Sequence, residues 1–177
     1  MDIYIIETND SEYIDNKLLF RYRKRDISNE KKLKIHCLAY LMLDRILKNI
    51  YKIENRNIVF ENGKPFLENK NKHFSISHSG EYIAICISDN ICGIDIEQNK
   101  KRNFIAIGKR MKFQATTLDD FYLDWTKYES EYKLGKSSNS IKQFKYNNYT
   151  ITASSAYKDE DFEIFIQNTN EFPNLNT

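Results

Sequence analysis

The sequence predicts an α+β fold built of two pseudo-symmetric halves, each a helix packed on a small antiparallel sheet. Segments with strand-like and helix-like periodicity follow the order strand, helix, strands and then helix, strands. The 177 residues suffice for a single compact unit. We place the first half at about 1–98, the second half at about 99–170 and a loose tail at 171–177.

The first half begins with a short strand expected at residues 2–6. Over residues 28–51 the apolar side chains recur at steps of three and four, which predicts an amphipathic helix with Ser28 as its N-cap. An Asn-Gly pair between two short apolar runs predicts a β-hairpin over 56–68. Further strands are expected at about 82–88 and 91–97.

The second half begins with a helix expected at roughly 117–134. Gly135 should end this helix, because glycine enters the left-handed cap conformation without strain. Further strands should follow a polar linker. The buried stripe of the helix is predicted to comprise Leu118, Phe121, Tyr122, Trp125 and Tyr132.

Composition favours a globular protein in a reducing compartment. The chain is 41% apolar and 14% aromatic with a net charge of only +2, which excludes wholesale disorder. Its three cysteines form no CxxC pair, and with three scattered histidines they lack the spacing of a zinc site. The sequence shows neither a signal peptide nor an apolar run of the ~20 residues needed to cross a bilayer. We therefore expect a cytoplasmic protein that does not bind membranes.

Cations are concentrated in the segment 17–34, which carries eight lysines and arginines against two acids. This composition fits a solvated helical face and equally a surface that binds phosphate or an acidic protein. Both interpretations stay open.

Residues 74–97 form the most informative stretch. It ends in the strand-like I-C-G-I-D-I-E, where Asp95 and Glu97 lie two residues apart and therefore project from one face. Two adjacent acids repel each other, and such an arrangement usually persists because a cation lies between them. A Ser-His-Ser-Gly turn expected at 77–80 could offer hydroxyls, an imidazole and backbone N–H groups to an anion. Together these features predict a metal-and-phosphate site.

Four short motifs follow one another along the chain: G-K-P at 63–65, F-S-I-S-H-S at 74–79, G-I-D-I-E at 93–97 and W-T-K-Y-E-S-E-Y-K at 125–133. In the same order, they resemble G-[KR]-P, F-N-[ILV]-S-H-S, G-[IV]-D-[IV]-E and W-[ST]-x-K-E-[SA]-x-x-K of the Sfp-type 4′-phosphopantetheinyl transferases. The resemblance implies the fold of that family. It also implies an enzyme that moves the 4′-phosphopantetheine arm of coenzyme A to a serine of an acyl or peptidyl carrier protein. The reaction would depend on Mg²⁺ and release adenosine 3′,5′-bisphosphate.

The resemblance implies that Asp95, Glu97 and Glu129 hold the Mg²⁺ ion. This set agrees with the preference of Mg²⁺ for carboxylates together with water and phosphate oxygens. The alternative is that Asp95 and Glu97 lie on a solvent-facing strand edge. Glu129 would then form an ordinary helix-surface pair with Lys133, four residues later.

The resemblance also implies a set of residues that bind coenzyme A. Ser77 and His78 would contact its phosphates, Lys64 its nucleotide and Lys133 its pyrophosphate, and Arg23 lies near the basic phosphate-contacting positions of the family. Outside such a motif, a histidine beside a strand is more often structural and a hairpin lysine is usually solvated. By the same resemblance, the catalytic residues are Glu129, Lys133 and His78.

Three departures from the family pattern bear on activity. Ser75 replaces the usual Asn, Tyr128 stands where the Trp-containing motif has Lys, and the segment 109–117 lacks the acid that many members carry. One alternative is therefore a degenerate relative that binds coenzyme A or a nucleotide with little or no transfer. A more remote alternative is a nucleic-acid-binding module, although the paired acids would repel a phosphate backbone. We expect a monomer whose partners are coenzyme A and a carrier protein, with no nucleic acid.

Overall fold

The computed structural model describes residues 1–8 and 29–168, and it confirms the α+β class. Arg23, its neighbouring cations in 17–25 and the tail at 171–177 lie outside these residues. Within the described ranges, no helix combines the length and the apolar character of a membrane span. The elements are β1 (Asp2–Glu7), α2 (Glu30–Asn49), β2 (Ile58–Glu61), β3 (Lys64–Leu67), β4 (His73–Ser79), β5 (Tyr82–Ser88), β6 (Cys92–Gln98), α3 (Phe104–Met111), α4 (Leu118–Leu134), β7 (Ser140–Tyr146), β8 (Tyr149–Ser155) and β9 (Glu163–Asn168).

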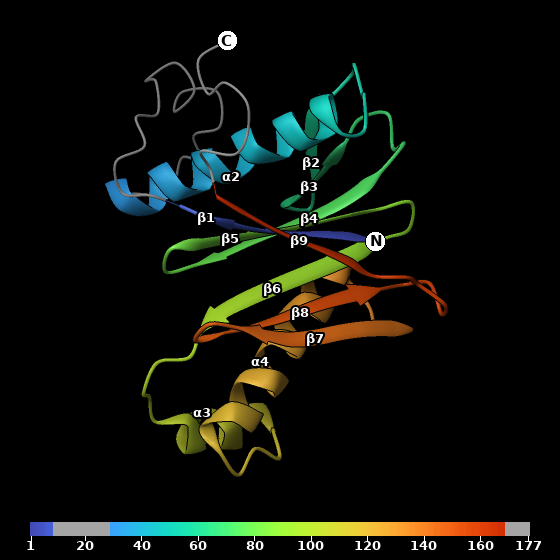
Figure 1. Ribbon diagram of the computed structural model, residues 1–177. Helices are drawn as coiled ribbons and strands as arrows, with labels where there is room; N and C mark the ends of the chain where they lie inside the picture. The colour runs from blue at the N-terminus through green and yellow to red at the C-terminus, as the bar shows by residue number, and fades with distance from the viewer. Residues whose placement is uncertain (9–28, 169–177) are drawn as a thin grey trace.

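Two sheets stack between two helices, in the order α2, first sheet, second sheet, α4 (Figure 1). The first sheet has the strand order β4-β5-β1-β9, and the second has the order β6-β8-β7. All neighbouring strands within them are antiparallel except β1 and β9, which run parallel. The expectation of purely antiparallel sheets was therefore wrong for the first sheet, because β9 from the end of the chain pairs with β1.

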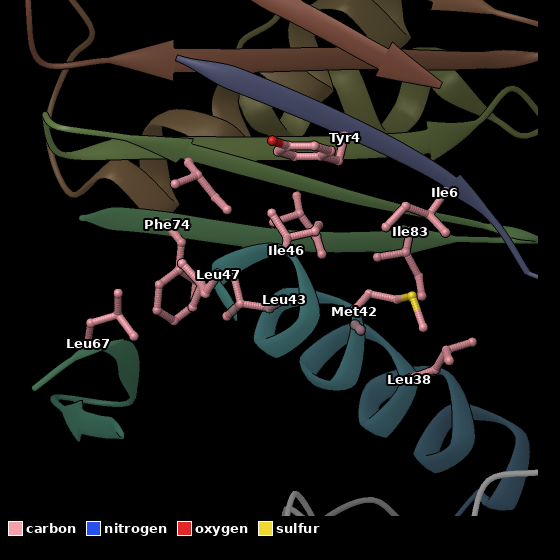
Figure 2. Close-up of a cluster of buried hydrophobic side chains, with 13 residues drawn as sticks. Tyr4, Ile6, Leu38, Met42, Leu43, Ile46, Leu47, Leu67, Phe74 and Ile83 are labelled. Carbon is pink, nitrogen blue, oxygen red and sulfur yellow. The ribbon is translucent and has the colours of Figure 1, made fainter. Parts of the chain in front are cut away.

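Helix α2 packs its apolar stripe on the outer face of the first sheet (Figure 2). Met42, Leu43 and Ile46 of this helix form one buried cluster with Tyr4 and Ile83 of the sheet. The helical periodicity predicted this face correctly. The N-cap is Asn29 rather than Ser28, since the Asn29 side chain accepts the N–H of Lys32 at 3.0 Å.

A second buried cluster fills the space between the two sheets. It includes Ile3 and Ile5 of β1 together with Ile94 and Ile96 of β6 and Ile151 of β8. Since side chains alternate along a strand, the residues of β6 that alternate with Ile94 and Ile96 face the opposite side of the second sheet, on which α4 packs.

Local signals set the ends of several elements as predicted. The β2–β3 hairpin turns at Asn62 and Gly63, whose φ angles of 50° and 78° are those of a two-residue primed turn. Helix α4 starts after Thr117, which forms a capping box with Asp120, and it ends at Gly135 with φ 87°.

Two expectations for the second half were wrong. Tyr132 was placed in the buried stripe of α4, but it is 68% exposed. The buried polar residues of α4 are instead Thr126 and Ser130, whose hydroxyls meet Thr152 and Ser154 of β8 at 2.7 and 2.6 Å. This interface is polar because β8 alternates, and its apolar residues face the core between the sheets. The short helix α3 was not expected.

Candidate active site

Strand β6 places the two acids of the G-I-D-I-E motif on one face. The side chains of Ile94 and Ile96 lie in the core between the sheets, so Asp95 and Glu97 project away from it. Asp95 is only 5% exposed, and Glu97 is half-buried. A pair of acids at this depth needs polar partners.

Two serines of β4 supply such partners. The Ser77 hydroxyl donates to Oδ1 of Asp95 at 2.8 Å, and the Ser79 hydroxyl donates to Oε2 of Glu97 at 3.1 Å. Because both serines and both acids are spaced by two residues, one face of β4 matches one face of β6. Ser77 therefore contacts a carboxylate here, and its contact with a phosphate stays a prediction.

The same strand edge also binds the backbone of β6. Ser75 Oγ accepts the N–H of Ile94 at 3.2 Å, and Ser79 Oγ accepts the N–H of Gln98 at 3.1 Å. Serine hydroxyls thus take the place of backbone ladder bonds where the two sheets meet. The expected turn at 77–80 was wrong, because His78 and its flanking serines belong to β4 and the chain reverses at Gly80 with φ 57°.

Lys133 of α4 pairs with the more buried acid. Its Nζ lies 2.8 Å from Oδ1 of Asp95 and 2.9 Å from the carbonyl oxygen of Ile94. Gly93 permits this approach: a Cβ atom there would lie 2.0 Å from the Ser130 carbonyl oxygen. The glycine of the motif therefore brings α4 close enough for its lysine to reach β6.

Burial raises the pKa values of three carboxyls, and the charge of one of them adds to this effect on the other two. Burial raises the pKa of Asp95, and the Lys133 charge offsets only part of this effect. The pKa values of Glu97 and Glu129 are raised by burial and further by the charge of Asp95. The charge of Asp95 thus acts on Glu129, and the role of Glu129 as a metal ligand stays a prediction. A cation bound among these carboxylates would relieve their repulsion.

One oxygen of the Asp95 carboxylate is available to bind a metal ion. Within the described residues, Oδ2 of Asp95 is buried without a hydrogen-bond partner, and such an oxygen is costly to desolvate. No group of three His, Cys, Asp or Glu side chains in the described ranges is close enough to enclose a metal ion. Mg²⁺ usually takes one or two carboxylates and completes its shell with water and substrate phosphate, so the donor set suits this ion without a closed cage.

A pocket of about 380 Å³ lies between α2, the β2–β3 hairpin, β4 and the end of α4, and Lys133 connects it to Asp95, although neither Asp95 nor Glu97 lines it. Three predicted residues, Lys64, His78 and Lys133, line it together, although they come from distant parts of the sequence. Ser77 and Glu129 are not among its lining residues. Sequence reasoning missed His36, Tyr40, Phe60, His73 and Tyr132, which also line the pocket.

The three histidines of the chain meet in this pocket. The pKa of His78 is lowered to about 4, first because protein atoms displace water around the imidazole and then because His36, Lys133 and Lys32 contribute positive charge. His78 is therefore neutral at pH 7, and the pocket around it favours anions. His36 and Tyr40 of α2 both line the pocket, and their rings are in contact. Their separation of four residues, one helical turn, is the sequence feature that places them on the same face of the helix.

The lowered pKa of His78 predicts a loss of stability in acid. Because the folded-state pKa of about 4 lies below the ordinary 6.5, the unfolded chain binds this proton first. The free energy of unfolding should therefore fall as the pH drops from 6.5 towards 4. His78→Asn should weaken this dependence in thermal denaturation at pH 7 and pH 5. Equal losses for variant and wild type would show that His78 titrates normally.

Three curated proteins with similar sequences are all named 4′-phosphopantetheinyl transferases. The 4′-phosphopantetheinyl transferase gsp of Aneurinibacillus migulanus is 35% identical over 113 residues, which cover 56% of this chain and 47% of that protein. The 4′-phosphopantetheinyl transferase psf-1 of Bacillus pumilus is 33% identical over 87 residues, 47% of this chain and 36% of that protein. A putative 4′-phosphopantetheinyl transferase of Haemophilus influenzae is 30% identical over 113 residues, 54% of this chain and 48% of that protein.

These comparisons confirm the resemblance predicted from the motifs. The chain spans less than half the length of each of these curated relatives. No protein-family model matches it.

Proposed function

We infer that this chain, a relative of the 4′-phosphopantetheinyl transferases, transfers the 4′-phosphopantetheine arm of coenzyme A to a serine of a carrier protein. The observation that carries the proposal is that a pocket lined by cationic side chains adjoins the buried Asp95 through Lys133. This lysine lines the pocket and contacts Asp95. A pyrophosphate group near Lys133 would thus reach both the cations and the carboxylates.

The cationic side chains would bind the phosphates of coenzyme A. Within the described residues, Lys133 uses two of its three N–H donors for Ile94 and Asp95, which leaves one for a phosphate oxygen. Lys64 and His78 would hold the nucleotide end. Arg23, which lies outside the described residues, would be a further contact to a phosphate. A neutral His78 can donate one hydrogen bond to a phosphate oxygen, and a bound anion would favour its protonation.

Of the predicted set Asp95, Glu97 and Glu129, one or two carboxylates would hold Mg²⁺, and substrate phosphate oxygens and water would complete its shell. When bound, the ion neutralises charge on the phosphate oxygens of the leaving group. The chain itself contributes the geometry: Ser77 and Ser79 fix the two β6 carboxylates, and α4 sets Glu129 and Lys133 on the facing side.

The transfer forms one P–O bond and breaks another. The carrier serine oxygen would attack the phosphorus next to the pantetheine arm, and the bond to the bridging oxygen would break to release adenosine 3′,5′-bisphosphate. The serine proton needs an acceptor. Asp120 is committed to the capping box of α4 and Asp119 pairs with Lys145, so Glu129 with its raised pKa is the better candidate.

The two-half architecture is part of this proposal. The orders β4-β5-β1 and β7-β8-β6 are equivalent if β1 corresponds to β6, and α2 and α4 each follow the first strand of their set. This equivalence supports two pseudo-symmetric halves, but it assigns β6 to the second half, so the boundary falls before Cys92 rather than at about residue 98. It also accounts for an active site at the edge where the two sheets meet, and it is consistent with a monomer.

A binding protein without transfer is the second candidate. The Lys133 ammonium already occupies one oxygen of Asp95, and the segment 109–117 offers no acid. These observations favour a slow or inactive relative that keeps the coenzyme A pocket.

One experiment separates the two candidates. The protein is incubated with coenzyme A, Mg²⁺ and apo carrier proteins, and the carriers are weighed by mass spectrometry. We expect modified carrier with wild type, and a strong loss with Lys133→Ala. Calorimetric binding of coenzyme A without any modified carrier would favour the binding protein, and the absence of both would overturn the proposal.

A further inference from the structure

Two exposed aromatic side chains flank the pocket from opposite elements. Phe60 of β2 is 59% exposed and Tyr132 of α4 is 68% exposed, yet both line the same pocket. Neither belongs to the two buried hydrophobic clusters. The fold therefore leaves two ring faces in water beside the cationic groups.

Exposed apolar side chains gather at this position. The large exposed hydrophobic residues in the described ranges are Ile50, Phe60, Ile91, Ile105, Tyr128, Tyr132, Tyr157 and Ile166. Phe60, Ile91 and Tyr132 line the pocket, and Tyr128 lines a neighbouring groove that shares Lys64 and Tyr132 with it. Such clustering marks a binding surface more than a scatter of single residues does.

Lys64 connects the two aromatic elements. Its Nζ donates to the carbonyl oxygen of Tyr132 at 3.2 Å, which joins the β2–β3 hairpin to the last turn of α4. The hairpin that carries Phe60 is thus held next to the helix that carries Tyr132. A ligand between them would meet an ammonium group as well as ring faces.

The side chains of the pocket suit a ligand that has both an anionic part and a flat, apolar part. His78, Lys133 and Lys64 suit phosphate groups, whereas the rings of Phe60 and Tyr132 suit a flat, polarisable group. A nucleotide combines both parts. In single-stranded nucleic-acid complexes, stacking of a base on an aromatic side chain strengthens binding by roughly 5- to 150-fold.

We propose that Phe60 and Tyr132 stack on the purine base of the bound nucleotide and so determine specificity for it. The proposal rests on the coenzyme A pocket of the proposed function and adds two residues outside all four motifs. The phosphates lie towards His78 and Lys133, and the base lies at the rim.

Binding of two probes tests this assignment. Adenosine 3′,5′-bisphosphate carries a base and phosphates, whereas inorganic pyrophosphate carries no base. By calorimetry, Phe60→Ala and Tyr132→Ala should each weaken binding of the bisphosphate by about tenfold or more and leave pyrophosphate binding within about twofold. Tyr132→Phe should retain wild-type affinity, because the ring remains.

The matched control is Tyr157→Ala, an exposed tyrosine at 53% that does not line the pocket, and it should change neither affinity. Equal weakening of both probes, or unchanged bisphosphate binding in both alanine variants, would overturn the stacking role. Neither readout requires transfer. If carriers stay unmodified while base-dependent binding is lost in the variants, the proposed reaction fails and the base site stands.

Discussion

Replacing Gly93 with alanine should displace α4 from the second sheet and remove transfer. A Cβ atom at this position would lie 2.0 Å from the Ser130 carbonyl oxygen and 2.9 Å from the Leu134 nitrogen, both backbone atoms that cannot rotate away. Overpacking of a core costs typically 1–3 kcal/mol, and a backbone clash belongs at or above the upper end. We expect the melting temperature to fall by about 6–12 °C for ~3 kcal/mol in a domain of this size.

Gly108→Ala is the matched control for this variant. Gly108 lies inside α3, and its added Cβ would meet its nearest neighbour, the Phe113 Cβ, at an ordinary 3.8 Å. Alanine is the better helix former by about 1 kcal/mol, so this variant should be neutral or more stable. Circular dichroism melts of both variants make the comparison. An unchanged melting temperature for Gly93→Ala would mean that α4 does not need the close approach described above.

Sequence patterns predicted those features that depend on neighbouring residues. The Asn62-Gly63 pair set the hairpin, and Gly135 set the end of α4, because both positions need a positive φ. The common face of Asp95 and Glu97 followed from the period of two in a strand. In each case the deciding physics acts within a few residues of the chain.

The missed features depend on contacts between distant segments. Ser75 looked like a departure from a motif, but its hydroxyl replaces a backbone acceptor for Ile94 on another sheet. Tyr132 was expected in the core because its position along α4 matches the helical period of the apolar residues. Helix α4 instead packs small residues with hydroxyl groups against the sheet, and the Tyr132 ring lies at the rim of the pocket. Which helix face packs inward was decided by the polar face of β6 and β8.

The assembly of the pocket was equally hidden from the sequence. His36 and His78 lie on a helix and a strand that are 42 positions apart (78 − 36), and only the packing of α2 on the first sheet brings them to one cavity. The motifs gave His78 its role by resemblance, whereas His36 lay outside every motif.

Replacing Asp95 with asparagine should reduce Mg²⁺-dependent transfer by at least about 10²–10³-fold, the range for loss of one charge-stabilising group at a reaction centre. Asparagine keeps the shape and an acceptor oxygen, so the hydrogen bonds from Ser77 and Lys133 can persist. What is lost is the negative charge and the affinity of Oδ2 for a cation.

The same variant should fold as well as wild type or better. Burial raises the pKa of Asp95, so the folded state binds its proton more tightly than the unfolded chain, and stability is lost as the pH rises through this raised pKa. Deprotonation of Asp95 therefore lowers the free energy of unfolding, and asparagine, which does not ionise, avoids this cost. Loss of activity with an equal or higher melting temperature would separate function from folding.

Addition of Mg²⁺ provides an independent measurement on Asp95. An ion that binds only the folded state raises the melting temperature, so wild type should be stabilised by excess Mg²⁺ with pyrophosphate and Asp95→Asn should respond much less. The control is Asp119→Asn, which removes an exposed acid that pairs with Lys145 on the surface, and it should behave as wild type. Full turnover and an undiminished Mg²⁺ response in Asp95→Asn would take this carboxylate out of the metal site, and the buried oxygen of Asp95 would then need another partner.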